Sequence, residues 1–169
     1  MTPSGLGGDP LSRSGRVVVA STRAAGGRYE DRCGPLIVDW LTRLGFAVPD
    51  PAVVPDGDPV GDALRAAVAE KVDVVVTSGG TGISPTDATP EQTAAVLDYQ
   101  IPGLAEAIRR SGLPKVPTAI LSRGVCGVAE RTLIVNLPGS PGGVRDGLTV
   151  LQQVLNHALD QIAGKDHPR

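Results

Sequence analysis

The chain has 169 residues, a formal charge of -2 and 41% hydrophobic residues. This length and composition suit one folded domain with a sizeable core, and they exclude a disordered chain. Because only 2% of the residues are aromatic, the core must be aliphatic, and a series of stacking faces for single-stranded nucleic acid is excluded. The balance of 16 basic against 18 acidic residues leaves no broad basic surface for a phosphate backbone.

The sequence contains no apolar run long enough to span a membrane, and its N-terminus lacks the pattern of a secretory signal. We therefore expect a cytoplasmic protein that binds neither membranes nor nucleic acid. The two cysteines, Cys33 and Cys126, are too few for a disulfide framework or a zinc site, and we interpret them as small buried apolar residues.

Residues 1–15 are small, polar and rich in glycine and proline, which predicts a flexible leader, and residues 165–169 are expected to form a flexible tail. Residues 16–164 are expected to form a single α/β domain. Its predicted elements, in chain order, are a strand at 17–21, a helix around 36–44, a strand within 46–55, a helix around 60–68, a strand at 72–78, helices at 90–97 and 103–111, strands at 119–121 and 132–136, and a helix at 144–162.

The strands at 17–21 and 72–78 are continuous apolar runs, as in a parallel sheet buried on both faces. The strand within 46–55 contains three prolines, which places it at an edge of the sheet. The alternation of strands and helices predicts a doubly wound, mostly parallel sheet in three layers, with helices on both faces.

Four predicted helix starts pair a candidate N-cap residue with a following proline. They are Gly34-Pro35, Asp58-Pro59, Thr89-Pro90 and Ser140-Pro141, and Thr89 to Gln92 also fits a capping box. The loops before these helices follow strands, so we expect them to gather at the carboxyl edge of the sheet, where such folds bind ligands. Unpaired N–H groups at helix starts favour anions there.

The stretch Ser78-Gly-Gly-Thr-Gly82 is the strongest local motif. It also fits a simple tight turn after a strand, and it is neither a Walker A loop nor a dinucleotide fingerprint. Its position after a buried strand, with Asp87 nearby, favours the binding of phosphate by backbone N–H groups. Asp56 and Asp87 are capping or turn residues, or they share a Mg²⁺ ion, which binds one or two carboxylates together with substrate phosphates.

Two arginines and one asparagine each have two interpretations. Arg23 and Arg123 either grip an anion or form ordinary surface ion pairs. Asn136 either hydrogen-bonds the edge of a purine or pterin or closes the turn before Pro138.

Three ordered stretches resemble the MogA/MoaB family of molybdenum cofactor biosynthesis. They are Thr77 to Glu91, Leu121-Ser-Arg123, and Leu133 to Gly143. The resemblance runs from about residue 16 to about residue 164. It implies a molybdopterin-binding domain with molybdopterin adenylyltransferase activity, which converts ATP and molybdopterin, with Mg²⁺, into adenylylated molybdopterin and pyrophosphate. It also implies a homotrimer and a molybdenum insertase as a partner.

The resemblance also implies roles for individual residues. The family's essential aspartates match Asp56 and Asp87, which would be catalytic and would hold the metal. The residues implied to bind the nucleotide or its phosphates are Gly79, Gly80, Thr81, Gly82, Asn136, Pro138 and Gly139. The residues implied to bind molybdopterin are Ser122, Arg123 and Ser21.

Two positions depart from the family pattern. Many members have Asp where this chain has Thr22, and many have Arg where it has Thr86, so contacts to phosphate differ at these two points. The alternative to adenylyl transfer is a non-catalytic protein that binds a pterin or nucleotide, or that serves as a scaffold for the insertase. A nucleotide hydrolase of the competence-damage type shares the glycine loop, but that family normally carries a second domain.

Overall fold

The computed structural model describes residues 12–165, so the first 11 residues of the expected leader and residues 166–169 of the expected tail lie outside it. Six strands form one sheet in the order β2-β1-β3-β6-β5-β4. They are β1 (Gly15–Ala20), β2 (Ala52–Val54), β3 (Val74–Ser78), β4 (Tyr99–Gln100), β5 (Cys126–Ala129) and β6 (Thr132–Leu137). The first four strands of this order pair in parallel, and β5 and β4 are antiparallel to their neighbours.

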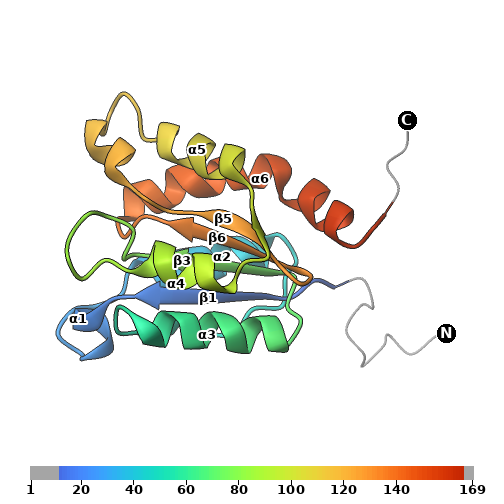
Figure 1. Ribbon diagram of the computed structural model, residues 1–169, viewed down its shortest axis with the longest axis horizontal. Helices are drawn as coiled ribbons and strands as arrows, with labels where there is room; N and C mark the ends of the chain where they lie inside the picture. Colours follow the sequence, from blue (N-terminus) through green and yellow to red (C-terminus); the bar gives the residue numbers. More distant parts are fainter. Residues whose placement is uncertain (1–11, 166–169) are drawn as a thin grey trace.

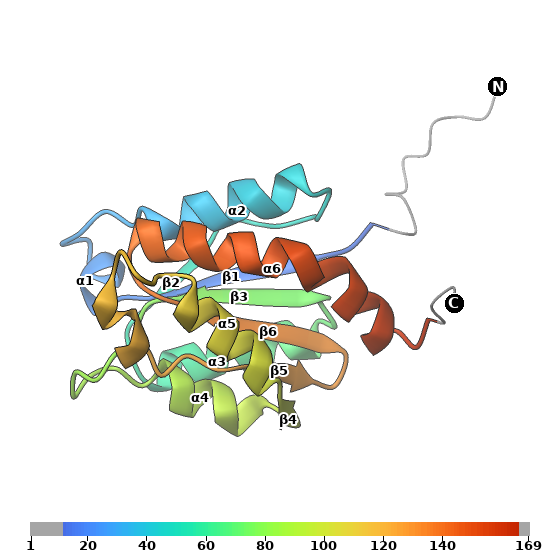
Figure 2. The ribbon, with the colours of Figure 1, turned by 90° about the horizontal axis from the view of Figure 1, so that it is seen from above.

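Helices cover both faces of the sheet (Figures 1 and 2). One face carries α2 (Cys33–Arg43), α5 (Pro102–Arg110) and α6 (Pro141–Ile162), and the other carries α3 (Asp58–Ala69) and α4 (Thr89–Val96). A short helix, α1 (Thr22–Ala25), follows β1, and a 3₁₀ helix, η1 (Pro117–Leu121), follows α5. The prediction of a three-layer, mostly parallel α/β sheet is confirmed.

The strand period of two divides the core between these layers. Along β1, Val17 and Val19 pack with α2 and α6, whereas Val18 and Ala20 pack with α3. Among the buried apolar side chains of the described chain, Phe46 is the only aromatic one. The core is therefore aliphatic, as the composition predicts.

The structure corrects the strand expected at 119–121. These residues belong to η1, which begins at Pro117, and Ile120 and Leu121 are exposed. Proline at the start suits a helical turn, and this segment pairs with no strand of the sheet. The antiparallel strands β4 and β5 were not predicted, because with only two and four residues they are too short to show a strand pattern in the sequence.

Only one of the four predicted helix caps is confirmed: the Ser140 hydroxyl accepts a hydrogen bond from the N–H of Gly143. Asp58 and Thr89 are the first residues of α3 and α4, so they are not N-caps. Helix α2 begins before Gly34, and the carboxylate of Asp31 accepts hydrogen bonds from the first N–H groups of this helix instead.

The chain is already tied to the domain before residue 16. Arg13 donates hydrogen bonds to Asn156 and Asp160 of α6, and the N–H of Ser14 donates to Asp73. Strand β1 then begins at Gly15, two residues before the strand predicted at 17–21 and one residue before the predicted start of the domain. Across the range 12–165, no helix is both long and apolar enough to cross a membrane.

Candidate active site

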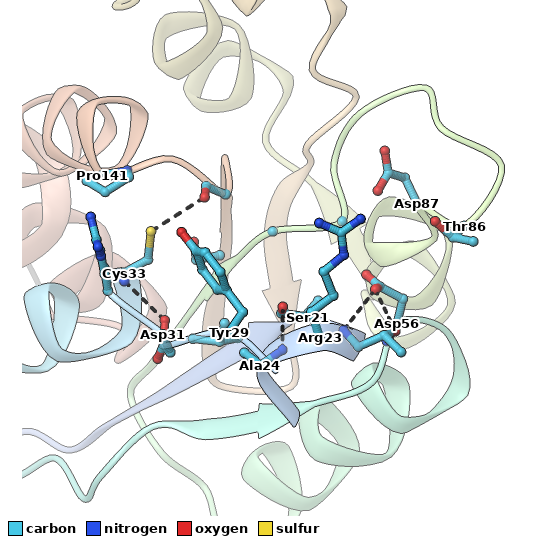
Figure 3. Close-up of a pocket in the computed structure, with 18 residues that line it drawn as sticks. Ser21, Arg23, Ala24, Tyr29, Asp31, Cys33, Asp56, Thr86, Asp87 and Pro141 are labelled. Atoms are coloured by element: carbon cyan, nitrogen blue, oxygen red, sulfur yellow. Dashed lines mark hydrogen bonds between the residues drawn. The ribbon is translucent and has the colours of Figure 1, made fainter. Parts of the chain in front are cut away.

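Two cavities lie side by side at the carboxyl edge of the parallel strands, as the sequence predicts. The first, of about 460 Å³, lies between the loops after β1, β2 and β3 (Figure 3). The second, of about 390 Å³, lies between the loop after β3, η1 and the start of α6. Both have the size of small-molecule sites. Gly80, Asp87 and Gly139 line both cavities, so the glycine-rich loop separates the two compartments.

Most of the predicted site residues line one of these cavities. Ser21, Asp56 and Gly79 line the first, and Thr81, Gly82, Ser122 and Pro138 line the second. Asp56 and Asp87, which are far apart in the sequence, share the first cavity (Figure 3). Arg123 and Asn136 are the two predicted residues that line neither cavity.

The glycines of the loop meet steric demands that no other residue meets. Gly79 has φ +92°, and a Cβ atom there would lie 2.4 Å from the carbonyl oxygen of Ala20. Gly80 has φ +68°, and a Cβ atom there would lie 2.3 Å from the hydroxyl of Thr89. Glycine is required by the left-handed backbone at both positions, by the close approach of β1 to Gly79 and by that of Thr89 to Gly80.

This loop presents unused hydrogen-bond donors to the cavities. The N–H of Gly79 donates to the carbonyl of Leu137. Within residues 12–165, by contrast, the N–H groups of Gly80, Thr81 and Gly82 have no acceptor. Successive free N–H groups of this kind form a concave site for an anion. The long helix α6 adds the positive end of its dipole, because Ser140 and Gly143 line the second cavity.

Both aspartates are held by hydrogen bonds, Asp56 by Thr22 at the start of α1 and Asp87 by Ser84 of its own loop. The hydroxyl of Thr22 donates to Oδ2 of Asp56 at 2.9 Å and accepts from the N–H of Asp56 at 3.2 Å. Oδ2 of Asp87 accepts a hydrogen bond from the N–H of Ser84 at 3.1 Å. Thr22, which departs from the family pattern, therefore fixes the orientation of Asp56. Thr86, the other departure, lines the first cavity.

Arg123 holds the loop after β3 in place. Its guanidinium donates to the carbonyl oxygens of Gly82 at 2.9 Å and Asp87 at 3.0 Å, and it forms an ion pair with Glu91. The hydrogen bond from Arg123 lowers the pKa of Glu91. These contacts join the two ends of the segment that carries Asp87. In this structure the guanidinium thus binds the protein itself, rather than lining the cavity that Ser122 lines.

Replacing Arg123 by alanine should loosen this segment. Loss of a charge-assisted pair and two hydrogen bonds should lower the free energy of local opening by about 1–2 kcal/mol, which is a roughly tenfold increase in exchange rate. The rate of this local opening is measured by amide hydrogen exchange in the intact protein, followed over residues 81–91. Arg110→Ala, which breaks only an exposed pair with Glu106, is the control. An unchanged exchange rate in the Arg123 variant would show that Arg123 does not hold the loop after β3 in place.

Asn136 is a structural residue in this arrangement. It is 2% exposed. Its Nδ2 donates to the hydroxyls of Thr77 and Thr93, both at 3.0 Å, and its Oδ1 accepts from the N–H of Val125. These bonds tie β6 to β3, to α4 and to the segment before β5. With its amide fully used inside the protein, Asn136 holds the following Pro138-Gly139 turn at the cavity and does not reach a base edge.

Thr89 is buried like Asn136, but its side chain has no hydrogen-bond partner among residues 12–165. It is 1% exposed, and within the described residues its hydroxyl is the only buried side-chain oxygen or nitrogen without a hydrogen-bond partner. The capping box predicted for Thr89 is therefore wrong. An unsatisfied buried hydroxyl costs about 1–3 kcal/mol.

Replacing Thr89 by valine, which keeps the shape and removes the hydroxyl, should therefore raise the melting temperature by roughly 2–4 °C. Thr93→Val is the matched control, because it removes an acceptor of Asn136 and should lower the melting temperature by a similar amount or more. Equal losses in both variants, measured by calorimetry, would show that the Thr89 hydroxyl is satisfied in solution.

Sequence reasoning missed the loop between α1 and α2. Its residues Tyr29, Asp31 and Arg32 line the first cavity, as does Cys33 at the start of α2. The thiol of Cys33 lies 3.6 Å from the carbonyl oxygen of Gly139, and burial raises its pKa. Burial raises the pKa of the other cysteine, Cys126, to about 12, in keeping with the predicted role of a buried apolar residue. The available signal in the sequence was a tyrosine close after a strand in a chain with few aromatic residues.

The family of probable molybdopterin binding domains, MoCF_biosynth, matches residues 16–157. The chain belongs to this family. It is similar to the molybdopterin adenylyltransferase of Helicobacter pylori, with 38% identity over 154 residues, which cover 88% of this chain and 86% of that one. It is also similar to the solved structure of the molybdopterin biosynthesis Mog protein from Mycobacterium ulcerans. That match has 68% identity and a TM-score of 0.87, and it covers 89% of this chain and 99% of that one.

A third relative is longer than this chain. The molybdenum cofactor biosynthesis bifunctional protein of Synechococcus elongatus is 36% identical over 152 residues, which are 89% of this chain and 48% of that protein. The chain thus spans about half the length of the bifunctional relatives it matches. The resemblance to the MogA/MoaB family that the three motifs predict is confirmed by this family match and by the Mycobacterium ulcerans structure.

Proposed function

We propose that this protein is a molybdopterin adenylyltransferase, which transfers AMP from ATP to the terminal phosphate of molybdopterin. The observation that carries the proposal is the shared cavity of Asp56 and Asp87, which Gly80 of the glycine-rich loop borders with its unused N–H group. Relatives at 36–39% identity bear the name of this activity. The second cavity, on the other side of Gly80, provides a separate compartment for the second substrate.

The donor set of the first cavity fits Mg²⁺. Among residues 12–165, no group of three or more histidine, cysteine or acidic side chains could hold a metal by itself. Two carboxylates suit a Mg²⁺ ion that takes its other ligands from substrate phosphates and water. Asp56 and Asp87 would hold this ion, and the bound ion would neutralise charge on the triphosphate.

In the proposed reaction, an oxygen of the molybdopterin phosphate attacks the α-phosphorus of ATP. A new P–O bond forms, the bond between the α- and β-phosphates breaks, and pyrophosphate leaves with the bonding electrons. The chain contributes mainly positioning and charge stabilisation. The N–H group of Gly80 orients phosphate oxygens of ATP in the first cavity. In the second cavity, the N–H groups of Thr81 and Gly82, with Ser122 and the start of α6, bind the attacking phosphate. Arg123 keeps Asp87 in place through the loop.

The direct test is incubation of the protein with molybdopterin, Mg²⁺ and ATP labelled at the α-phosphate. We expect adenylylated molybdopterin and pyrophosphate in equal amounts. Tight binding of Mg-ATP without product would contradict catalysis and would favour the alternative, a non-catalytic binding protein or a scaffold for the insertase. Isothermal titration with Mg-ATP measures this binding, and the product assay decides between the two functions.

The same resemblance supports a homotrimer, a molybdenum insertase as the acceptor of the product, and a cytoplasmic location. An exposed apolar surface lies around the end of α5 and η1 and consists of Leu113, Val116, Ile120 and Leu121, of which Val116 and Leu121 also line the second cavity. Exposed apolar side chains that lie together are typical of contact surfaces between proteins. We assign this surface to contacts between subunits, and sedimentation equilibrium tests the trimer.

A further inference from the structure

Tyr29 occupies an unusual position for one of the few aromatic residues of this chain. It lies in the loop between α1 and α2, lines the first cavity and is 57% exposed. Its ring stands upright in the cavity, between Cys33 and Pro141 on one side and Arg23 on the other (Figure 3). The other described tyrosine with similar exposure, Tyr99 at 59%, lies on the edge strand β4 and lines neither of the two cavities.

The first cavity has two ends of different chemistry. At one end, Asp56, Thr86 and Asp87 adjoin the glycine-rich loop, and the side chains are acidic or polar (Figure 3). At the other end, Tyr29 stands beside the small side chains of Cys33 and Pro141 and near Asp31, whose carboxylate already accepts hydrogen bonds from the N–H groups of Cys33 and Gly34. Arg32 also lines this cavity. Arg23 lies between the two ends, with its guanidinium directed toward the glycine-rich loop.

These two ends match the two halves of a nucleoside triphosphate. A purine base is flat and weakly polar, and it stacks on an exposed aromatic ring. A triphosphate needs N–H donors, a cation and arginine. Only one orientation puts the phosphates beside Asp56 and Asp87, and it brings the base to the end that contains the aromatic ring.

We propose that Tyr29 is the stacking face for the base of the nucleotide, with Arg23 binding the phosphate chain between the base and the carboxylates. This assignment rests on the proposed function, because it orients the same substrate in the same cavity. It makes Tyr29 a determinant of nucleotide affinity that takes no part in the chemistry at phosphorus. One ring stacks any purine, so the subsite favours purine over pyrimidine nucleotides without selecting adenine strictly.

The test is isothermal titration of four proteins, the wild type, Tyr29→Ala, Tyr29→Phe and Tyr99→Ala, with Mg-ATP and with Mg-tripolyphosphate. In Tyr29→Ala the Kd for ATP should rise about 5- to 100-fold, the usual effect of losing one stacking ring. Tyr29→Phe and Tyr99→Ala should stay within about twofold of the wild type. The Kd for tripolyphosphate, which has no base, should be the same in all four proteins.

Each contrary result has a distinct meaning. Wild-type affinity for ATP in Tyr29→Ala overturns the stacking assignment and leaves the proposed function intact. Equal weakening of ATP and tripolyphosphate, or equal losses in the Phe and Ala variants, also overturns it, because the ring face then does not bind the base. A wild-type protein that binds tripolyphosphate but not ATP overturns it directly, whereas one that binds neither ligand refutes the proposed function itself.

Discussion

Replacing Asp87 by asparagine is expected to lower kcat for adenylylation by at least ~100-fold, and Asp56→Asn should have a comparable effect. Both carboxylates line the cavity proposed for Mg-ATP. Asparagine keeps the size of each side chain and one oxygen to accept the hydrogen bond from Ser84 or Thr22. It removes the negative charge that holds the cation. The loss should therefore appear in catalysis and in the Mg²⁺ concentration for half-maximal rate, with little change in melting temperature.

The measurement is the initial rate at saturating ATP over a range of Mg²⁺ concentrations. Asp50→Asn is the control, because Asp50 is an exposed carboxylate that lines neither of the two cavities, and its removal changes the net charge equally. Near-normal turnover of Asp87→Asn would refute the metal role of that carboxylate. A large fall in the melting temperature of Asp87→Asn would instead assign a structural role to Asp87, in the loop to which Arg123 donates its hydrogen bonds.

Replacing Gly79 by alanine is expected to cost about 3 kcal/mol or more in free energy of unfolding. The methyl group would meet the backbone carbonyl of Ala20 at 2.4 Å, and φ is +92°. A residue forced into that region costs about 1–3 kcal/mol before any clash is counted. For a domain of this size the melting temperature should fall by roughly 6–12 °C. ATP binding should also fall, because β1 and the glycine-rich loop must separate.

Gly103→Ala is the matched control. Gly103 lies in the first turn of α5, and a Cβ atom there would meet nothing within 4 Å. Alanine favours helix over glycine by up to about 1 kcal/mol, so this variant should be as stable as the wild type or more stable. If thermal denaturation gave equal small changes for both variants, the approach of β1 to the glycine-rich loop would be looser than in this structure.

Local sequence patterns predicted the elements that bury most of their surface. The apolar runs that became β1, β3 and β6 leave no alternative to a buried strand, and the 3.6-residue period marks α6 from Val144 to Ile162. Weaker patterns failed. The segment 119–121 is apolar, but it has no strand to pair with, and β5 becomes a strand only because β6 lies beside it. Short elements depend on tertiary contacts more than on propensity.

The same division holds for the site. The short-range motifs identified Asp56, Asp87 and the glycine-rich loop, since each carries its chemistry within a few consecutive residues. The roles of Arg123 and Asn136 were open in the sequence, because an arginine or an asparagine has many potential partners. Arg123 bonds to residues 36 and 41 positions away, and Asn136 to residues 43 and 59 positions away. No local pattern encodes partners at such separations.

The sequence alone determined that the chain alternates buried strands with amphipathic helices, and that its acidic and glycine-rich segments follow the strands. Tertiary structure decided which of these segments meet. The order β2-β1-β3-β6 brings the loops after β1, β2 and β3 together, so Tyr29, Asp56 and Asp87 border one cavity. The physical reason is that hydrogen bonding between strands sets the strand order, and through it the loops that become neighbours, across distances that local propensity does not reach.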